Sequence, residues 1–133
     1  MADSFTFELV SPERLLLSAS VSEVVLPGSE GEMTVMANHA PTMTTIRPGV
    51  LTVKDTSGQA QRFVVFGGFA DILPSGCTVL AESALAVADF KKDALSKRVD
   101  LAKADLEVAK SDEAKTRIAQ LIADLNGLSS LAA

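Results

Sequence analysis

The chain contains one cysteine, one histidine and neither tryptophan nor tyrosine. The single cysteine, Cys77, cannot form an internal disulfide or a thiolate metal cluster, so we interpret it as a small apolar residue of a strand in a reducing compartment. Six phenylalanines are the only aromatic residues, so the core must be built mainly from Val, Leu, Ile and Ala. These scarcities exclude the disulfide-rich secreted class and cysteine-based metal sites.

Basic clusters and long apolar runs are also missing. Twelve Lys and Arg residues against 17 Asp and Glu give a net charge of −5, and the scattered cations exclude nucleic acid as a partner. The longest apolar run, FVVFGGFADIL, is interrupted by glycine and aspartate and is shorter than the ~20 residues of a membrane-spanning helix. The N-terminal residues lack the pattern of a signal or transit peptide. We therefore expect membrane association only through a partner complex.

The first two thirds of the chain show a strand pattern. The 133 residues, 47% hydrophobic and 22% charged, are typical of one folded domain or a small domain with an appendage. From Phe5 to about Ala84, short runs alternate apolar and polar residues and are separated by Pro, Gly, Ser and Asn turn signals. About eight to ten such strands, spaced roughly ten residues apart, predict an N-terminal β-sandwich or flattened barrel over residues 1–86.

The last third has a helical pattern. Glycine is absent between Gly76 and Gly127, and apolar residues recur at spacings of four and three, which is typical of amphipathic helices. We predict helices over about residues 89–110 and 112–126, which form an antiparallel two-helix hairpin within residues 87–133. The two apolar stripes are Leu95, Val99, Ala102, Leu106 and Ala109, and then Ala114, Ile118, Leu121, Leu125 and Leu128.

The ends of both predicted helices carry capping signals. Asp89 is placed to cap the first helix and Ser111 the second, because short polar side chains accept hydrogen bonds from free N–H groups at a helix start. Asn126-Gly127 is a helix-stop signal.

Enzyme signatures are absent from the sequence. There is no Gly-rich loop ending in Gly-Lys-Ser/Thr, no His-Glu-x-x-His, no Gly-x-Ser-x-Gly and no Cys-x-x-Cys. A general base at His39 would need a nucleophile and an orienting acid, and a lone histidine disfavours a metal site. We interpret His39 as part of a loop or interface. The alternative is a small β-barrel hydrolase or ligand-binding domain that uses His39 and Glu32 as acid and base.

Five short motifs carry a resemblance to a known family. In chain order they are Pro27-Gly28-Ser29-Glu30-Gly31-Glu32, His39-Ala40-Pro41, Arg47-Pro48-Gly49-Val50, Gly67-Gly68-Phe69-Ala70 and Thr78-Val79-Leu80-Ala81. Together they resemble the epsilon subunit of bacterial F-type ATP synthase, the counterpart of the mitochondrial delta subunit. The resemblance covers the predicted β-domain, and a C-terminal helical hairpin completes the family architecture.

The resemblance implies a non-catalytic rotor subunit of the central stalk, with no active site of its own. Such a subunit couples proton-driven rotation of the c-subunit ring to ATP synthesis. Its partners would be the gamma subunit and the c-ring, on the cytoplasmic face of the bacterial inner membrane. Six positions match the family's interface with the c-ring and gamma, namely Ser29, Gly31, Glu32, His39, Pro41 and Thr42.

The resemblance also implies a regulatory role for the hairpin. In the family, the hairpin extends and inhibits ATP hydrolysis through basic residues that meet the alpha and beta subunits; Lys110, Lys115 and Arg117 are the candidates here. The family's ATP-binding motif, Asp-x-x-Arg-Ala, is replaced by residues 91–95, KKDAL, so we expect no bound cofactor. The family's Pro-Gly before the histidine is replaced by Ala37-Asn38, and asparagine tolerates the same left-handed turn.

Overall fold

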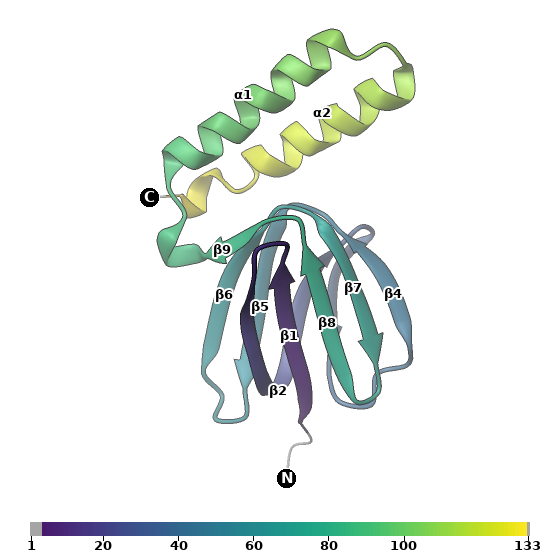
Figure 1. Ribbon diagram of the computed structural model, residues 1–133, viewed down its shortest axis with the longest axis vertical. Coiled ribbons are helices and arrows are strands. Elements are labelled where there is room, and N and C mark those ends of the chain that lie inside the picture. Colours follow the sequence, from purple (N-terminus) through teal and green to yellow (C-terminus); the bar gives the residue numbers. More distant parts are fainter. Residues whose placement is uncertain (1–3, 133) are drawn as a thin grey trace. The chain divides into compact units, whose positions relative to one another are not determined.

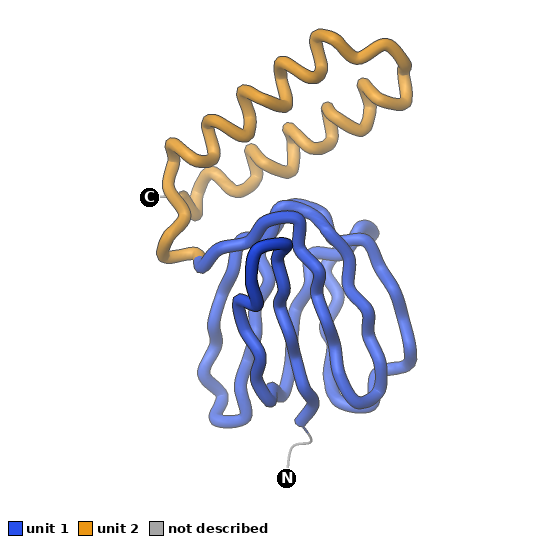
Figure 2. Tube along the Cα trace, in the orientation of Figure 1, with its two compact units in different colours: residues 1–86 blue, residues 87–133 orange. Residues whose placement is uncertain are grey.

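The computed structural model describes residues 4–132 of the chain. The chain divides into two compact units, residues 1–86 and residues 87–133 (Figure 2). The first unit contains the β-strands and the second contains the helices.

The first unit is a nine-stranded β-structure, and the predicted β-sandwich is confirmed. The two runs LLLSASV and SEVVLP, separate in the sequence pattern, form one long strand. The strands are β1 (Phe5–Ser11), β2 (Arg14–Gly28), β3 (Gly31–Val35), β4 (Thr42–Ile46), β5 (Gly49–Asp55), β6 (Ala60–Val65), β7 (Gly68–Leu73), β8 (Gly76–Ala81) and β9 (Ala84–Ala86).

The long strand β2 belongs to both layers of the sandwich. Its first half pairs with β1, which continues the order β4-β7-β8-β1 on one layer (Figure 1). Its second half pairs with β3 and β5 on the other layer, which continues to β6 and β9. The register shifts between Val21 and Glu23, where the Ser22 hydroxyl donates to the carbonyls of Lys54 and Asp55. This bulge lets one strand turn from one layer into the other.

Alternate residues of the strands form the core between the layers. Phe5, Phe7 and Leu9 of β1 are buried while Thr6 is exposed, because successive side chains of a strand point to opposite faces. Cys77 lies in this core as expected, and its burial, with a smaller contribution from the nearby charge of Asp71, raises the pKa of the thiol to about 12.

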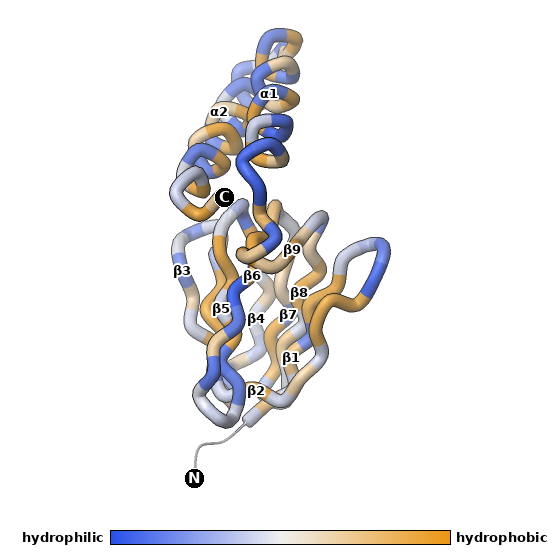
Figure 3. The backbone as a smooth tube through the Cα atoms, turned by 90° about the vertical axis from the view of Figure 1, so that its left-hand side faces the viewer, coloured by the Kyte–Doolittle hydropathy of each residue, from blue (hydrophilic) through white to orange (hydrophobic). Residues whose placement is uncertain are grey.

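The second unit contains α1 (Lys92–Val108) and α2 (Asp112–Asn126), with short 3₁₀ turns at Val87–Asp89 and Ser129–Leu131. Residues 109–111 connect the helices and reverse the chain, so the predicted antiparallel hairpin is confirmed (Figure 1). Along both helices the backbone alternates between hydrophilic and hydrophobic residues (Figure 3). No helix within residues 4–132 is both long and apolar enough to cross a membrane.

The start of α1 differs from the prediction. The helix begins at Lys92 instead of residue 89, and the N-cap position is Lys91, without a side-chain cap. Asp89 does not cap the helix, because it ends a separate 3₁₀ turn that Phe90 closes by donating its N–H to the carbonyl of Val87. The hydrophobic Phe90, fully buried, then intervenes before the helix.

The other helix ends follow the sequence more closely. At the end of α1, Ala109 donates its N–H to the carbonyl of Leu106, which tightens the last turn and ends the helix two residues before the predicted boundary. The cap at Ser111 is confirmed, since its hydroxyl accepts the N–H of Ala114 at 3.0 Å. Helix α2 ends at Asn126, as expected.

Candidate docking surfaces

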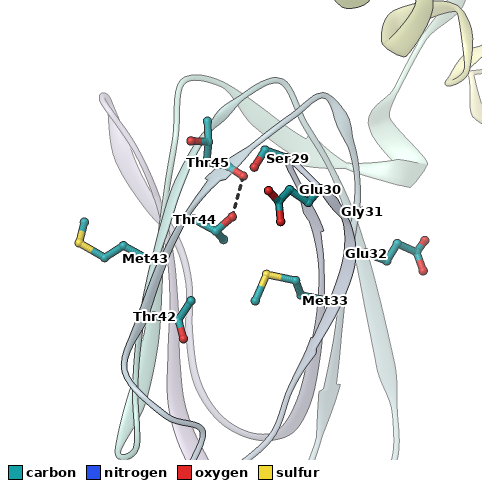
Figure 4. A pocket seen from close by; sticks show the side chains of 9 residues that line it. All are labelled: Ser29, Glu30, Gly31, Glu32, Met33, Thr42, Met43, Thr44 and Thr45. Carbon is teal, nitrogen blue, oxygen red and sulfur yellow. Dashed lines mark hydrogen bonds between the residues drawn. The ribbon is translucent and has the colours of Figure 1, made fainter.

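A groove opens between the edge strands β3 and β4. Its volume is about 500 Å³, and it is lined by residues 29–33 and residues 42–45 (Figure 4). One end is closed where β2 meets β4: the N–H of Ser29 donates to Thr45 O at 2.9 Å, and that of Arg47 donates to Pro27 O at 3.0 Å. Beyond this point the chain turns from β2 into β3, so the two edges separate.

The turn into β3 depends on a glycine. Gly28 and Gly31 are opposite each other in the β2–β3 ladder, with only Ser29 and Glu30 between them. Gly31 has a φ of 128°, a conformation that residues with a Cβ rarely adopt. The turn therefore places Glu30 at the closed end of the groove.

The groove walls are polar. Thr42 and Thr44 line one side, and Figure 4 shows Glu30 and Met33 pointing between the two strands, whereas Glu32 and Met43 point away. The Thr44 hydroxyl donates to the carbonyl of Thr45 at 3.3 Å. Lys and Arg are absent from the nine lining residues, so the carboxylate of Glu30 has no counter-charge within the groove.

The structure places the predicted interface residues in two groups. Ser29, Gly31, Glu32 and Thr42 line the groove together. His39 and Pro41 lie in the segment between β3 and β4 and do not line it.

The histidine segment has a defined backbone. The Nδ1 atom of His39 lies 2.8 Å from the carbonyl oxygen of Ala40, so this ring nitrogen acts as a donor. Asn38 has a φ of 65°, and its N–H donates to the carbonyl of Pro74. The left-handed turn that the sequence predicts at Asn38 is confirmed.

The three basic candidates lie in the helical unit. Lys110 is in the connection between the helices, and Lys115 and Arg117 are exposed on α2. Because 115 and 117 are two positions apart, their side chains leave the helix in different directions.

A row of apolar side chains crosses the outer face of the β4-β7-β8-β1 layer. In register order it contains Phe69, Leu80, Val10 and Leu15, and we call it the apolar row. Phe69 and Leu80 are 41% exposed and Leu15 is 53% exposed. This row was not predicted from the sequence. The signal was a break in alternation, since Phe69 and Leu80 occupy outward positions where polar residues are expected.

The next row across the same face is acidic. Asp71 lies opposite Met43 on one side and Thr78 on the other, and Thr78 is paired with Glu8. Strands β1, β4, β7 and β8 contain no Lys or Arg. This outer face therefore combines apolar area with two carboxylates, Glu8 and Asp71, and its four strands supply no Lys or Arg to balance them. Such a pattern is typical of a docking surface for a partner that is both apolar and basic.

Metal chemistry finds no support in the described part of the chain. Among residues 4–132, no group of three or more His, Cys, Asp or Glu side chains is arranged to hold a metal ion. His39 does not line the groove that contains Glu32, so the acid-base pair of the alternative hypothesis is not assembled there.

Comparisons with known proteins agree with the fold. Residues 4–87 match the family described as "ATP synthase, Delta/Epsilon chain, beta-sandwich domain". The chain is also similar in structure to a chain of the mitochondrial ATP synthase of Euglena gracilis, with a TM-score of 0.74 and 21% identity over 96% of this chain and 80% of that one. A chain of the Tetrahymena thermophila enzyme gives a TM-score of 0.63 at 15% identity, covering 96% and 97%. The chain therefore belongs to the class of delta/epsilon chains of ATP synthases.

Relatives with known names narrow this class. The chain is 62% identical to the ATP synthase epsilon chain of Sinorhizobium medicae over 96% of this chain and 95% of that relative. It is 63% identical to the epsilon chain of Rhizobium rhizogenes over 97% and 96%. The chain belongs to the bacterial ATP synthase epsilon-chain family, so it is a non-catalytic accessory subunit of the rotor stalk. The hydrolase alternative is set aside.

Proposed function

We propose that this chain couples rotation of the c-ring to ATP synthesis by joining the gamma subunit to the ring. The observation that carries the proposal is the outer face of the β4-β7-β8-β1 layer, where the apolar row lies beside the carboxylates of Asp71 and Glu8. A rotor subunit must stay bound to the gamma subunit through many rotations, and burial of apolar area is the main source of such stable association.

The gamma subunit occupies this outer face. Full burial of a large apolar side chain is worth about 1.5–3 kcal/mol, so residues that are already half-buried gain on the order of 1 kcal/mol each. The four members of the apolar row supply the central contact. Asp71 and Glu8 then select a partner with Lys or Arg at the matching positions.

The c-ring meets the turn between β2 and β3. Ser29, Gly31 and Glu32 stand at this turn, and Glu32 points away from the groove into solvent (Figure 4). An exposed carboxylate on a rigid turn suits a contact with polar loops of the ring. His39, Pro41 and Thr42 lie at the other end of β3 and β4, where Asn38 donates its N–H to the carbonyl of Pro74, and they supply a second contact with gamma and the ring. The assembled protein is peripheral, on the cytoplasmic face of the bacterial inner membrane.

The helical hairpin regulates ATP hydrolysis in this proposal. Its candidate contacts with the alpha and beta subunits are Lys110, Lys115 and Arg117, all exposed. Removal of residues 88–133 should raise the ATPase activity of the assembled F1 motor, and an unchanged rate would contradict the regulatory role alone.

The main proposal is tested by association. A tagged chain should co-purify with gamma and the other F-type motor subunits, and cross-linkers placed at positions 32 and 39 should reach gamma or the c-ring. A chain that never associates with the motor would overturn the proposal. Cross-links from positions 32 and 39 to other subunits only would overturn the assignment of the interface.

A further inference from the structure

Strand β4 has an open edge that faces the groove. It pairs with β7 over five positions, but with β2 only where Gly28 meets Ile46. The carbonyl of Thr45 and the N–H of Arg47 both point to the β2 side. Because backbone groups of a strand alternate in direction, the N–H and C=O of Met43 point to this side as well. Met43 is paired with Asp71 of β7 on the other side, but on the β2 side no strand within residues 4–132 pairs with it.

This edge lacks the protection that edge strands normally carry. Natural edges avoid unwanted pairing through charged residues, proline or bulges. The β4 sequence, TMTTI, contains no charged residue and no proline, and every residue except Met43 is β-branched. Such residues favour extended backbone. The open part of this edge, residues 42–44, is about 10 Å long at 3.3 Å per residue, because Thr45 and Ile46 already contact β2 and the turn after it. It is suited to accept a short extended segment of another chain.

The open edge is continuous with the apolar row. A shallow depression of about 370 Å³ is lined by residues 43–45 of β4 together with Gly68 and Phe69 of β7. Phe69 is the first member of the apolar row, so a partner that covers this row reaches the Met43 edge without a break. In the proposed function this partner is the gamma subunit, and the inference below rests on that proposal.

The charge beside the edge defines the partner segment further. Glu30 points between β3 and β4 (Figure 4), and the groove contains no cation of its own. A bound strand along β4 would bring its side chains next to this carboxylate. A Lys or Arg in the segment would neutralise it, and the exchange of water for a charge-assisted hydrogen bond favours binding.

We propose that the Met43 edge of β4 binds an extended segment of the gamma subunit by strand addition, with a Lys or Arg of that segment facing Glu30. The backbone N–H and C=O of Met43 supply the ladder bonds. The threonines on either side keep the strand extended, and the apolar row anchors the adjoining part of gamma.

The test compares two substitutions at one position. Met43→Pro removes the N–H that strand addition needs, and it costs no internal ladder bond because that N–H faces the open edge. Met43→Ala keeps the N–H and removes the side chain, which is the matched control. Both full-length variants are titrated into F1 core particles depleted of this chain, and their thermal unfolding is recorded. We expect Met43→Pro to bind at least tenfold more weakly and Met43→Ala less than threefold more weakly.

The outcomes separate this inference from the proposed function. If the natural chain does not bind the depleted F1 core, the proposed function fails. If the natural chain binds and Met43→Pro binds within twofold of it, strand addition is wrong while the proposed function stands. Equal losses in the two variants would assign the contact to the Met43 side chain and would also overturn strand addition.

Amide hydrogen exchange of the natural chain supplies a measurement that needs no variant. The exchange of the Met43 amide should slow at least tenfold in the complex with the F1 core. An unchanged rate would overturn the proposal, as would protection that appears only after the c-ring is added.

The charge of Glu30 is tested separately. Glu30→Gln should lower the affinity for the F1 core about threefold or more at low salt, and Glu23→Gln on the opposite layer is the control. Equal affinities of the two variants would remove the cationic partner from the proposal.

Discussion

Phe69 and Leu80 lie opposite each other in the β7–β8 ladder, and each leaves 41% of its surface exposed on the outer face. The neighbouring inward residues, Ala70 and Val79, are fully buried. These strands thus have apolar residues on both faces, although only one face packs against the core. In the proposed function, the gamma subunit covers this apolar face.

The apolar row should be needed for assembly and dispensable for folding. The double variant Phe69→Ser and Leu80→Ser should weaken binding to the depleted F1 core at least tenfold, since 1.4 kcal/mol corresponds to tenfold. Its unfolding free energy should fall by about 2 kcal/mol or less, because only part of each side chain is buried in the free chain. Leu101→Ser, at an exposed leucine of α1, is the matched control. Wild-type affinity in the double variant would refute the docking role of this row.

Gly68 should be irreplaceable for a steric reason. It has a φ of 131°, and an added Cβ would collide with the backbone of Leu80 and Ala81. We expect Gly68→Ala to destabilise the protein by about 3 kcal/mol or more, through strain and displacement of β8. Gly58 also has a positive φ, of 91°, but has open space around it, so Gly58→Ala should cost only about 1–2 kcal/mol. Urea denaturation measures both values, and equal costs would contradict the steric explanation.

Asp55 should stabilise its turn in a pH-dependent way. Its Oδ1 accepts the Ser57 hydroxyl at 2.6 Å and the N–H groups of Ser57 and Gln59. These bonds, the Ser57 hydroxyl first, hold the pKa of the Asp55 carboxyl below its ordinary value. A depressed pKa in the folded state stabilises the protein above the unfolded pKa, and this stabilisation is lost as the pH falls through the folded value.

Substitution tests this linkage. Asp55→Ala should lower the unfolding free energy at pH 7, and its difference from the natural chain should shrink as the pH drops from about 4. Ser57→Ala, which keeps the charge but removes the strongest partner, should give a smaller loss with the same pH trend. A difference that stays constant down to pH 2 would exclude the carboxylate as its source.

The Cys77 thiol should be inert in the folded protein. Burial, aided by the charge of Asp71, raises its pKa to about 12, and the thiolate is the reactive form. At pH 8 a thiol reagent such as DTNB should react only after unfolding in guanidinium. Because the folded pKa is raised, the thiol should also cost stability as the pH rises above about 8.5, and Cys77→Ala should remove that slope. Rapid labelling of the folded chain would contradict this.

Much of the fold could be predicted because periodicity reports burial. The period-two alternation of Phe5, Phe7 and Leu9 indicated a strand with one buried face, and the 4-3 spacing of Leu95, Val99 and Ala102 indicated a helical stripe. Boundaries were less accessible. The start of α1 was displaced from Asp89 to Lys92 because burial of Phe90 in the intervening segment outweighed a good capping residue.

The candidate site was only partly visible in the sequence. The glycine-rich turn at 28–31 drew attention to Ser29, Gly31 and Glu32, since turn chemistry is local. Two other features depend on pairings between strands far apart in the chain. They are the groove that the turn forms with Thr42, and the apolar row that contains Phe69 and Val10. No local pattern encodes such pairings.

The sequence by itself determined the strand and helix classes and the left-handed turn at Asn38, because each rests on residues that are neighbours in the chain. It also indicated the family, because five short motifs stand in the family's order along the chain. Tertiary structure alone decided that β2 serves both layers and that β4 keeps an open edge at Met43. It also aligned the four apolar side chains of β7, β8, β1 and β2 into one row. The physical reason is that register between distant strands is set by packing of the whole core, which no single segment specifies.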